Sequence, residues 1–199
     1  MNRTSINRLK GGHPILRAIA REHVQWCQTK VDEYFGANKA SIEIAQCHRD
    51  PLFQDELFAR GRNEKGEIVD KNLLVTWARG IDSYHSCLPY GLALAYDIYP
   101  LNLETKLLDY KMIPDNLWRA FALRGQTLAL TPGYFFSSKK VDPPHYNISL
   151  LGFSAAAIHR EFAQLPFDIA KEEFRRNWEK QNALIANRLY EQIDKEMSA

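Results

Sequence analysis

The stretch SYHSCLPYGLALAYD, from Ser83 to Asp97, carries a histidine near one end and an aspartate at the other. Its second half alternates between bulky and small side chains, and this period of two predicts a strand over Leu88–Leu101. One face carries Leu92, Leu94, Tyr96 and Ile98, and the other carries Ala93, Ala95 and Asp97. The small neighbours of the aspartate leave room for a bound ligand, so the rest of the chain can be organised around this strand.

A second stretch, Asp142-Pro143-Pro144-His145, offers a matching histidine. Alternation over residues 145–150 predicts another strand, with His145 on its polar face and two stiffening prolines before it. Two histidines and an aspartate are ligands that zinc accepts, and a catalytic zinc site needs three protein ligands and an open position. We therefore expect His85, Asp97 and His145 to bind Zn²⁺.

Each of these residues also has a purely structural interpretation. A lone histidine is more often a hydrogen-bonded structural residue than a metal ligand. Asp142, which precedes two prolines, can cap a turn. Asp142 lies three residues before His145, and the zinc interpretation uses this spacing. This spacing lets its carboxylate approach a water molecule at the metal, where a general base is needed.

The remaining periodicity predicts helices around a small sheet. Apolar residues at steps of three and four indicate a helix over Pro14–Phe35, which begins at a proline and ends before a glycine. Alternation predicts a strand over Ala40–Gln46. Further helices are expected over Leu52–Arg60 and from Pro114 to Gly125. The expected fold class is α+β: a small antiparallel sheet carrying the zinc site, flanked by helices, with a C-terminal helical extension.

The composition excludes several classes of protein. The 199 residues, 45% of them hydrophobic and 25% charged, are sufficient for one good core. A net charge of +2 does not favour nucleic acid as a partner. Three irregularly spaced cysteines argue against a disulfide framework and for a reducing compartment. The first residues lack the apolar region of an export signal, and no run could cross a membrane. We therefore expect synthesis in the cytoplasm without a signal peptide, and no stable membrane insertion.

Together these residues resemble a family of zinc peptidases that act on bacterial peptidoglycan. It includes L-alanyl-D-glutamate endopeptidases (endolysins), D-alanyl-D-alanine carboxypeptidases and VanX-type dipeptidases. The family signature S-x-H-x-x-G-x-A-x-D is similar to Ser83–His85 together with Ala95–Asp97, and the distal D-x-P-H segment is similar to Asp142–His145. The resemblance implies His85, Asp97 and His145 as zinc ligands and Asp142 as the catalytic base.

The resemblance covers about residues 9 to 150 and is nearest to the L-alanyl-D-glutamate branch. Leu9–Leu16 resembles its L-x-G-V-H-P-x-L opening, with a glycine at the usual valine, and Cys47–Arg62 resembles its G-Y-R-[ST]…Q…L-[YF]-A-x-G-R pattern. The resemblance implies that Arg49 holds the substrate carbonyl or oxyanion, a role that suits a planar fixed cation, with a surface salt bridge as its structural alternative. The candidate substrate contacts, each with packing as the alternative role, are Arg62, Tyr84 and Tyr146.

One departure from the family pattern concerns the spacing of the first two ligands. His85 and Asp97 are twelve positions apart in this sequence, whereas the family pattern has seven. An insertion of five residues within Ser86–Tyr90 explains the difference, because loops lengthen at small cost. The alternative alignment takes Gly91 as the glycine of the motif, but it puts Ala95 at the position of the aspartate and loses a ligand.

We expect two parts of the chain, a zinc peptidase catalytic domain over residues 1–150 and a helical C-terminal extension over residues 151–199. A charged helix over Ile169–Met197 carries an apolar stripe that must be buried. Packing onto the catalytic domain is the expected arrangement, and dimerisation or cell-wall binding are the alternatives. The oligomeric state stays open, with a monomer favoured.

The function that the resemblance implies is hydrolysis of an amide bond in the peptidoglycan stem peptide by a phage-type endolysin. Zn²⁺ is the implied cofactor, the stem peptide the implied partner and the L-alanyl-D-glutamate bond the implied target. Such a protein would act on the wall after its release, passing from the host cytoplasm to the periplasm if it is phage-encoded. The alternatives are a D-alanyl-D-alanine carboxypeptidase or dipeptidase with the same zinc chemistry, and a non-catalytic wall-binding or phage structural protein.

Overall fold

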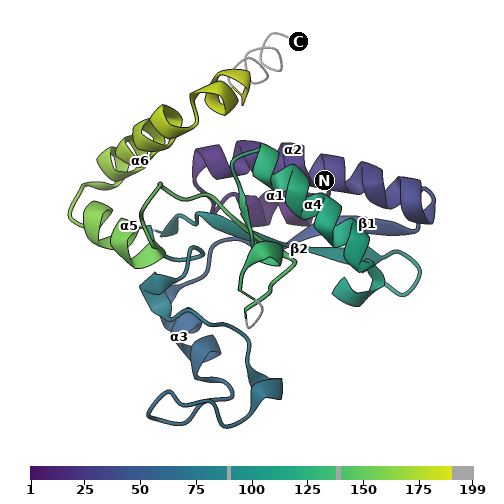
Figure 1. The fold of residues 1–199 in the computed structure, drawn as a ribbon, viewed down its shortest axis with the longest axis horizontal. Coiled ribbons are helices and arrows are strands. Elements are labelled where there is room, and N and C mark those ends of the chain that lie inside the picture. Colours follow the sequence, from purple (N-terminus) through teal and green to yellow (C-terminus); the bar gives the residue numbers. More distant parts are fainter. Residues whose placement is uncertain (89–90, 138–139, 190–199) are drawn as a thin grey trace.

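A four-stranded antiparallel sheet lies at the centre of the structure, a computed structural model that describes residues 1–88, 91–137 and 140–189 (Figure 1). In the order β1-β2-β4-β3, its strands are β1 (Ala40–Gln46), β2 (Ala95–Asn102), β4 (His145–Asn147) and β3 (Thr131–Pro132). Helices pack against this sheet, and further helices form the C-terminal end of the described chain. The architecture confirms the predicted α+β class.

The register of β2 brings two of the predicted ligands together. Strand β2 pairs with β1 on one side and with β4 on the other, where Asp97 lies directly opposite His145. Alternation turns Tyr96 to the opposite face, where its hydroxyl forms a 2.8 Å hydrogen bond with His23 of helix α2 (Pro14–Phe35). Helix α2 therefore covers one face of the sheet, while the carboxylate of Asp97 lies on the other.

Strand β2 begins at Ala95, later than the predicted start near Leu88, so the predicted start is wrong. Residues 89–90 lie outside the described part of the chain. Just before the strand, the backbone of Ala93 forms an isolated bridge with Gly12 in the N-terminal turn. The alternating pattern extends further than the strand because Ala93 and Leu94, just before it, are also buried.

The helix boundaries follow local sequence signals. Helix α2 has its predicted bounds, and α3 (Pro51–Ala59) differs by one residue at each end from its prediction. The carboxylate of Asp50 accepts hydrogen bonds from the first amides of α3 and so caps it. Helix α4 (Asp115–Thr127) was also expected. Helix α1 (Arg3–Leu9), which contacts β1, was not predicted.

The C-terminal segment is helical but interrupted. Helices α5 (Ala155–Phe162) and α6 (Phe167–Gln181) are followed by helical residues 183–189. Between α6 and the helical residues 183–189, Asn182 has φ −126° and ψ 38°, and this conformation lies outside the helical region. The predicted uninterrupted helix over Ile169–Met197 is therefore wrong, and its part beyond residue 189 lies outside the described residues.

Buried side chains of α6 hold this segment against the rest of the chain. The ring of Phe174 is 5.0 Å from that of His13 and 5.9 Å from that of Phe162. Trp178 is buried as well, and His13 Nε2 donates a hydrogen bond to the carbonyl of Lys171 at 3.0 Å. The first half of the chain thus covers this part of the apolar stripe, while the domain division at residue 150 stays a prediction.

We expect Phe174→Ala to lower the free energy of unfolding by about 3–5 kcal/mol, because Phe174 is 0% exposed and its removal leaves a cavity beside the rings of His13 and Phe162. Urea unfolding followed by tryptophan fluorescence measures this change. Leu184→Ala is the matched control, since Leu184 is 89% exposed and its truncation should change stability by less than about 0.5 kcal/mol. Equal effects of the two variants would contradict the packing described here.

Candidate metal centre

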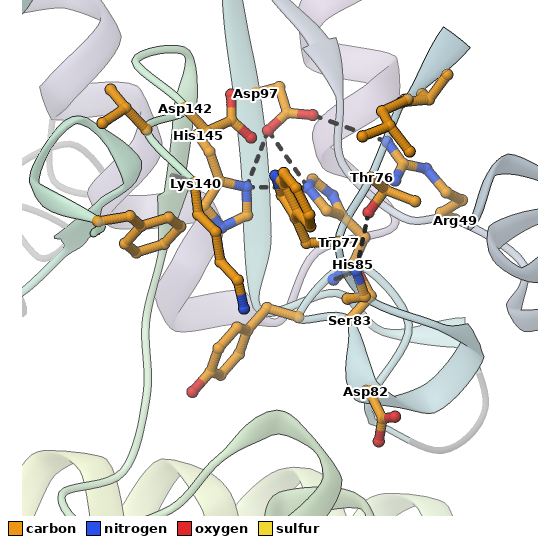
Figure 2. A pocket seen from close by; sticks show the side chains of 16 residues that line it. Arg49, Thr76, Trp77, Asp82, Ser83, His85, Asp97, Lys140, Asp142 and His145 are labelled. Atoms are coloured by element: carbon orange, nitrogen blue, oxygen red, sulfur yellow. Dashed lines mark hydrogen bonds and ion pairs between the residues drawn. The ribbon is translucent and has the colours of Figure 1, made fainter. Parts of the chain in front are cut away.

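Three side chains from separate elements converge in a cavity of about 430 Å³ (Figure 2). Asp97 comes from β2, His145 from β4, and His85 from the turn after the 3₁₀ helix η2 (Gly80–Asp82). Asp97 Oδ1 lies 3.3 Å from His85 Nε2 and 3.1 Å from His145 Nδ1, and the two nitrogens are 3.3 Å apart. One ligand atom from each residue lies within 4.8 Å of the others, so the group could hold a metal ion.

Hydrogen bonding determines which nitrogen of His85 faces this cluster. His85 Nδ1 donates to the carbonyl oxygen of Cys47 at 2.6 Å, and a carbonyl oxygen can only accept. The Nε2 atom is therefore the nitrogen that faces Asp97 Oδ1 and His145 Nδ1, and in the neutral imidazole it would direct a lone pair toward them. Three electron-rich atoms this close need a cation between them, either a proton or a metal ion. A backbone carbonyl behind the ring is also the usual support of a metal-binding histidine.

The long spacing between His85 and Asp97 does not separate their side chains. The backbone amide of Arg49 donates to the carbonyl of His85 at 3.0 Å and so fastens the turn that carries the histidine. Within the predicted insertion, the carbonyl of Cys87 accepts a 2.9 Å hydrogen bond from His159 Nδ1 on α5. The described part of the insertion therefore packs against the C-terminal segment. Asp97, and not Ala95, is therefore the residue that lies with the two histidines, while the insertion itself stays a prediction.

Charges within the cluster compensate one another. Burial raises the pKa of Asp97, but the charges and hydrogen bonds of His85 and His145 outweigh burial and hold that pKa well below its usual range. Burial lowers the pKa of His145, yet its hydrogen bond to Asp97 and the charges of Asp97 and Asp142 raise it above the ordinary value. The carboxylates of Asp97 and Asp142 thus stabilise positive charge on the neighbouring imidazole of His145.

Asp142, the predicted general base, lies beside His145 at the cavity (Figure 2). Its carbonyl oxygen accepts a hydrogen bond from the backbone amide of His145 at 3.1 Å, which closes a tight turn before β4. A Cβ atom at Gly133 would collide with that carbonyl, so the turn requires a glycine there. Burial raises the pKa of Asp142, and the charge of His145 offsets this increase only in part.

Arg49, the predicted oxyanion contact, lies on the other side of Asp97 (Figure 2). Its Nη2 is 3.8 Å from Asp97 Oδ2, and its Nη1 donates to Gln54 Oε1 at 2.6 Å. The Nε atom is buried and has no hydrogen-bond partner among the described residues. With a side chain only 11% exposed, Arg49 is not part of a surface salt bridge, and its guanidinium retains donors for a further acceptor.

The predicted substrate contacts separate into two groups. Tyr84 lines the cavity, as expected of a residue that could meet a ligand. Tyr146 is 0% exposed, because the alternation of β4 turns it into the core, where its ring lies 4.4 Å from that of His23. Arg62 Nη2 donates to the carbonyl of Thr76 at 3.1 Å and does not line the cavity. Tyr146 and Arg62 therefore have the packing role that was the structural alternative to substrate contact.

Sequence reasoning missed most of the wall around the cluster. The wall includes Thr76, Trp77, Ser83, Phe136 and Lys140. The ammonium of Lys140 lies 5.9 Å from the centre of the Trp77 ring. The segment 74–79 has no regular secondary structure, so no period in the sequence marks it. The signal available in the sequence was the presence of apolar residues in this segment. In the structure their side chains are exposed, between two short 3₁₀ helices.

We expect the protein to bind one divalent ion per chain, with Zn²⁺ as the probe in calorimetry on chelator-treated protein. Because the ion binds the folded state, Zn²⁺ at 100 times its dissociation constant should stabilise the fold by about 2.7 kcal/mol. His145→Ala and Asp97→Ala should each abolish this stabilisation, whereas Asp168→Asn, which alters an 85% exposed carboxylate on α6, should retain it. Equal binding by all four proteins would contradict the assignment of the cluster.

Comparison of the chain with family models and with curated proteins gave no match. Among the described residues, no helix combines the length and the hydropathy needed to cross a membrane. The site itself consists of two imidazoles and a carboxylate around one point, with Asp142 and Arg49 beside them.

Proposed function

We propose that the protein is a zinc-dependent peptidase that hydrolyses an amide bond in the stem peptide of bacterial peptidoglycan, with the L-alanyl-D-glutamate bond as its target. The observation that carries this proposal is the convergence of His85, Asp97 and His145 in one cavity, with both Asp142 and Arg49 at its edge. Two imidazole nitrogens and one carboxylate oxygen suit zinc and leave a position open for catalysis. The target bond is taken from the motif resemblance alone.

The chemistry is hydrolysis of an amide by water. A zinc ion held by the three ligands supplies Lewis acidity, which polarises the scissile carbonyl and makes water easier to deprotonate. The carboxylate of Asp142 accepts a proton from the attacking water as its oxygen bonds to the carbonyl carbon. Asp142 then returns that proton to the nitrogen of the leaving amine as the C–N bond breaks. A raised pKa suits a carboxylate that must both accept and return a proton.

Arg49 provides the second contribution. Its guanidinium lies within the cavity wall, carries a permanent charge and has unused donors. In the proposed reaction it donates hydrogen bonds to the carbonyl oxygen of the substrate, on which negative charge develops as water attacks. Stabilisation of charge that appears only in the transition state raises kcat rather than affinity for the substrate.

We expect Asp142→Asn to lower kcat on purified peptidoglycan by about 10²–10⁴-fold while zinc binding is retained, because the amide cannot accept the proton. Turbidity loss measures the rate, and metal analysis measures zinc. Asp168→Asn is the control, since its carboxylate is on α6 and largely exposed. Full activity of Asp142→Asn would remove this residue from the mechanism.

The target bond can be identified from the products. Cleavage at the L-alanyl-D-glutamate bond should leave glycan strands ending in L-alanine, detected by mass spectrometry of the digest. Loss of terminal D-alanine would instead identify a carboxypeptidase with the same zinc chemistry. Binding to the wall with no cleavage by the zinc-loaded protein would refute the peptidase and support the non-catalytic alternative.

A further inference from the structure

We propose that Gln54 is a positioning residue that holds Arg49 and the cavity wall of residues 74–78 in one arrangement. Gln54 lies on α3 and is 0% exposed. Its side chain reaches from the arginine beside the metal cluster to a segment of the wall. The geometric part of the inference stands on its own, and its kinetic part rests on the proposed peptidase function.

Both the oxygen and the nitrogen of the Gln54 side-chain amide have hydrogen-bond partners. Its Oε1 accepts from Arg49 Nη1 at 2.6 Å, while its Nε2 donates to the carbonyl of Ala78 at 2.6 Å and to Thr76 Oγ1 at 3.0 Å. Rotation of the amide by half a turn would set N–H groups against the guanidinium and an oxygen against the carbonyl. The amide therefore has one acceptable orientation, and that orientation joins Arg49 to the wall.

The wall needs such a support because it has no secondary structure of its own. Residues 74–79 form neither helix nor strand. Side chains of α3 and of the residues just after it hold this segment: Gln54 at two points, Arg62 through the carbonyl of Thr76, and Asp55 through the amide of Gly80 at 2.9 Å. Contacts made by α3 thus help to position Trp77, which lines the cavity.

A neutral partner for Arg49 has a further consequence. Gln54 accepts a hydrogen bond from one N–H of the guanidinium and carries no charge of its own. The positive charge of Arg49 beside Asp97 is therefore not neutralised by this contact. A glutamate at this position would neutralise the arginine and would also lose both donors to the wall. The amide is therefore the side-chain type that supports the wall and preserves the positive charge at the same time.

The test uses the zinc-loaded, full-length chain and two readouts. In protein labelled with 5-fluorotryptophan, the ¹⁹F signal of Trp77, assigned with Trp77→Phe, reports the wall. Gln54→Ala should shift or broaden that signal and lower kcat/KM by about 10²-fold, the size of effect expected from misplaced catalytic groups, while zinc stoichiometry is unchanged. Gln54→Glu should not restore activity, because it restores the acceptor for Arg49 but not the neutral charge or the donors.

The matched control is Gln28→Ala. Gln28 on α2 also makes three hydrogen bonds, to Asp32, to the carbonyl of Ala40 and from the amide of Ile42, but it joins α2 to β1 away from the cavity. Its loss should lower stability without changing the Trp77 signal or kcat/KM. If Gln54→Ala does not fold, Thr76→Val removes one wall contact and leaves the Arg49 contact in place, and it should alter the Trp77 signal.

An unchanged Trp77 signal in folded Gln54→Ala, or in Thr76→Val where Gln54→Ala does not fold, would overturn the positioning role. A changed signal with unchanged kcat/KM in Gln54→Ala would overturn the coupling to Arg49. If the parent protein shows no peptidase activity, the proposed function fails, but the Trp77 signal still decides whether Gln54 positions the wall. The two failures are therefore distinguishable.

Discussion

The pairing of Asp97 with His145 across strands β2 and β4 is the constraint on which the rest of the site depends. A shift of β4 by one residue in this register would turn His145 into the core and put Tyr146 in the cavity. The opposite face prevents that shift. There Tyr96 and Tyr146 stack with ring centres 5.6 Å apart, and the Tyr96 hydroxyl bonds to His23. The tyrosines on that face thus fix the positions of the candidate metal ligands on the other face.

A second constraint is electrostatic. Asp97 is a carboxylate with a side chain only 17% exposed, and a charge removed this far from water must be compensated or it destabilises the fold. His85 and His145 on one oxygen and Arg49 near the other provide that compensation. The arrangement also explains why Arg49 is part of the same structural unit as the candidate metal ligands.

The sheet, helix α3 and the C-terminal helices each make a different contribution to the cavity. The sheet supplies two ligands at fixed register, whereas α3 and its hydrogen bonds supply the wall and orient Arg49. The C-terminal helices support the turn that carries His85, through His159 on the carbonyl of Cys87. The extension is therefore connected to the candidate site by a direct contact, although none of its described residues, up to 189, lines the cavity.

The sequence by itself determined the elements whose signals are local. Prolines, capping side chains and periodicity specified α2, α3, α4 and β1, because helix ends and alternating faces depend on neighbouring residues. The motif resemblance also selected the three residues that converge. Only the tertiary structure decided that Tyr146 is a core residue, that Arg62 supports a wall, and that Gln54 joins this wall to Arg49. Those roles come from contacts between segments far apart in the chain, such as the hydrogen bonds from Gln54 to Thr76 and Ala78, and no local pattern encodes them.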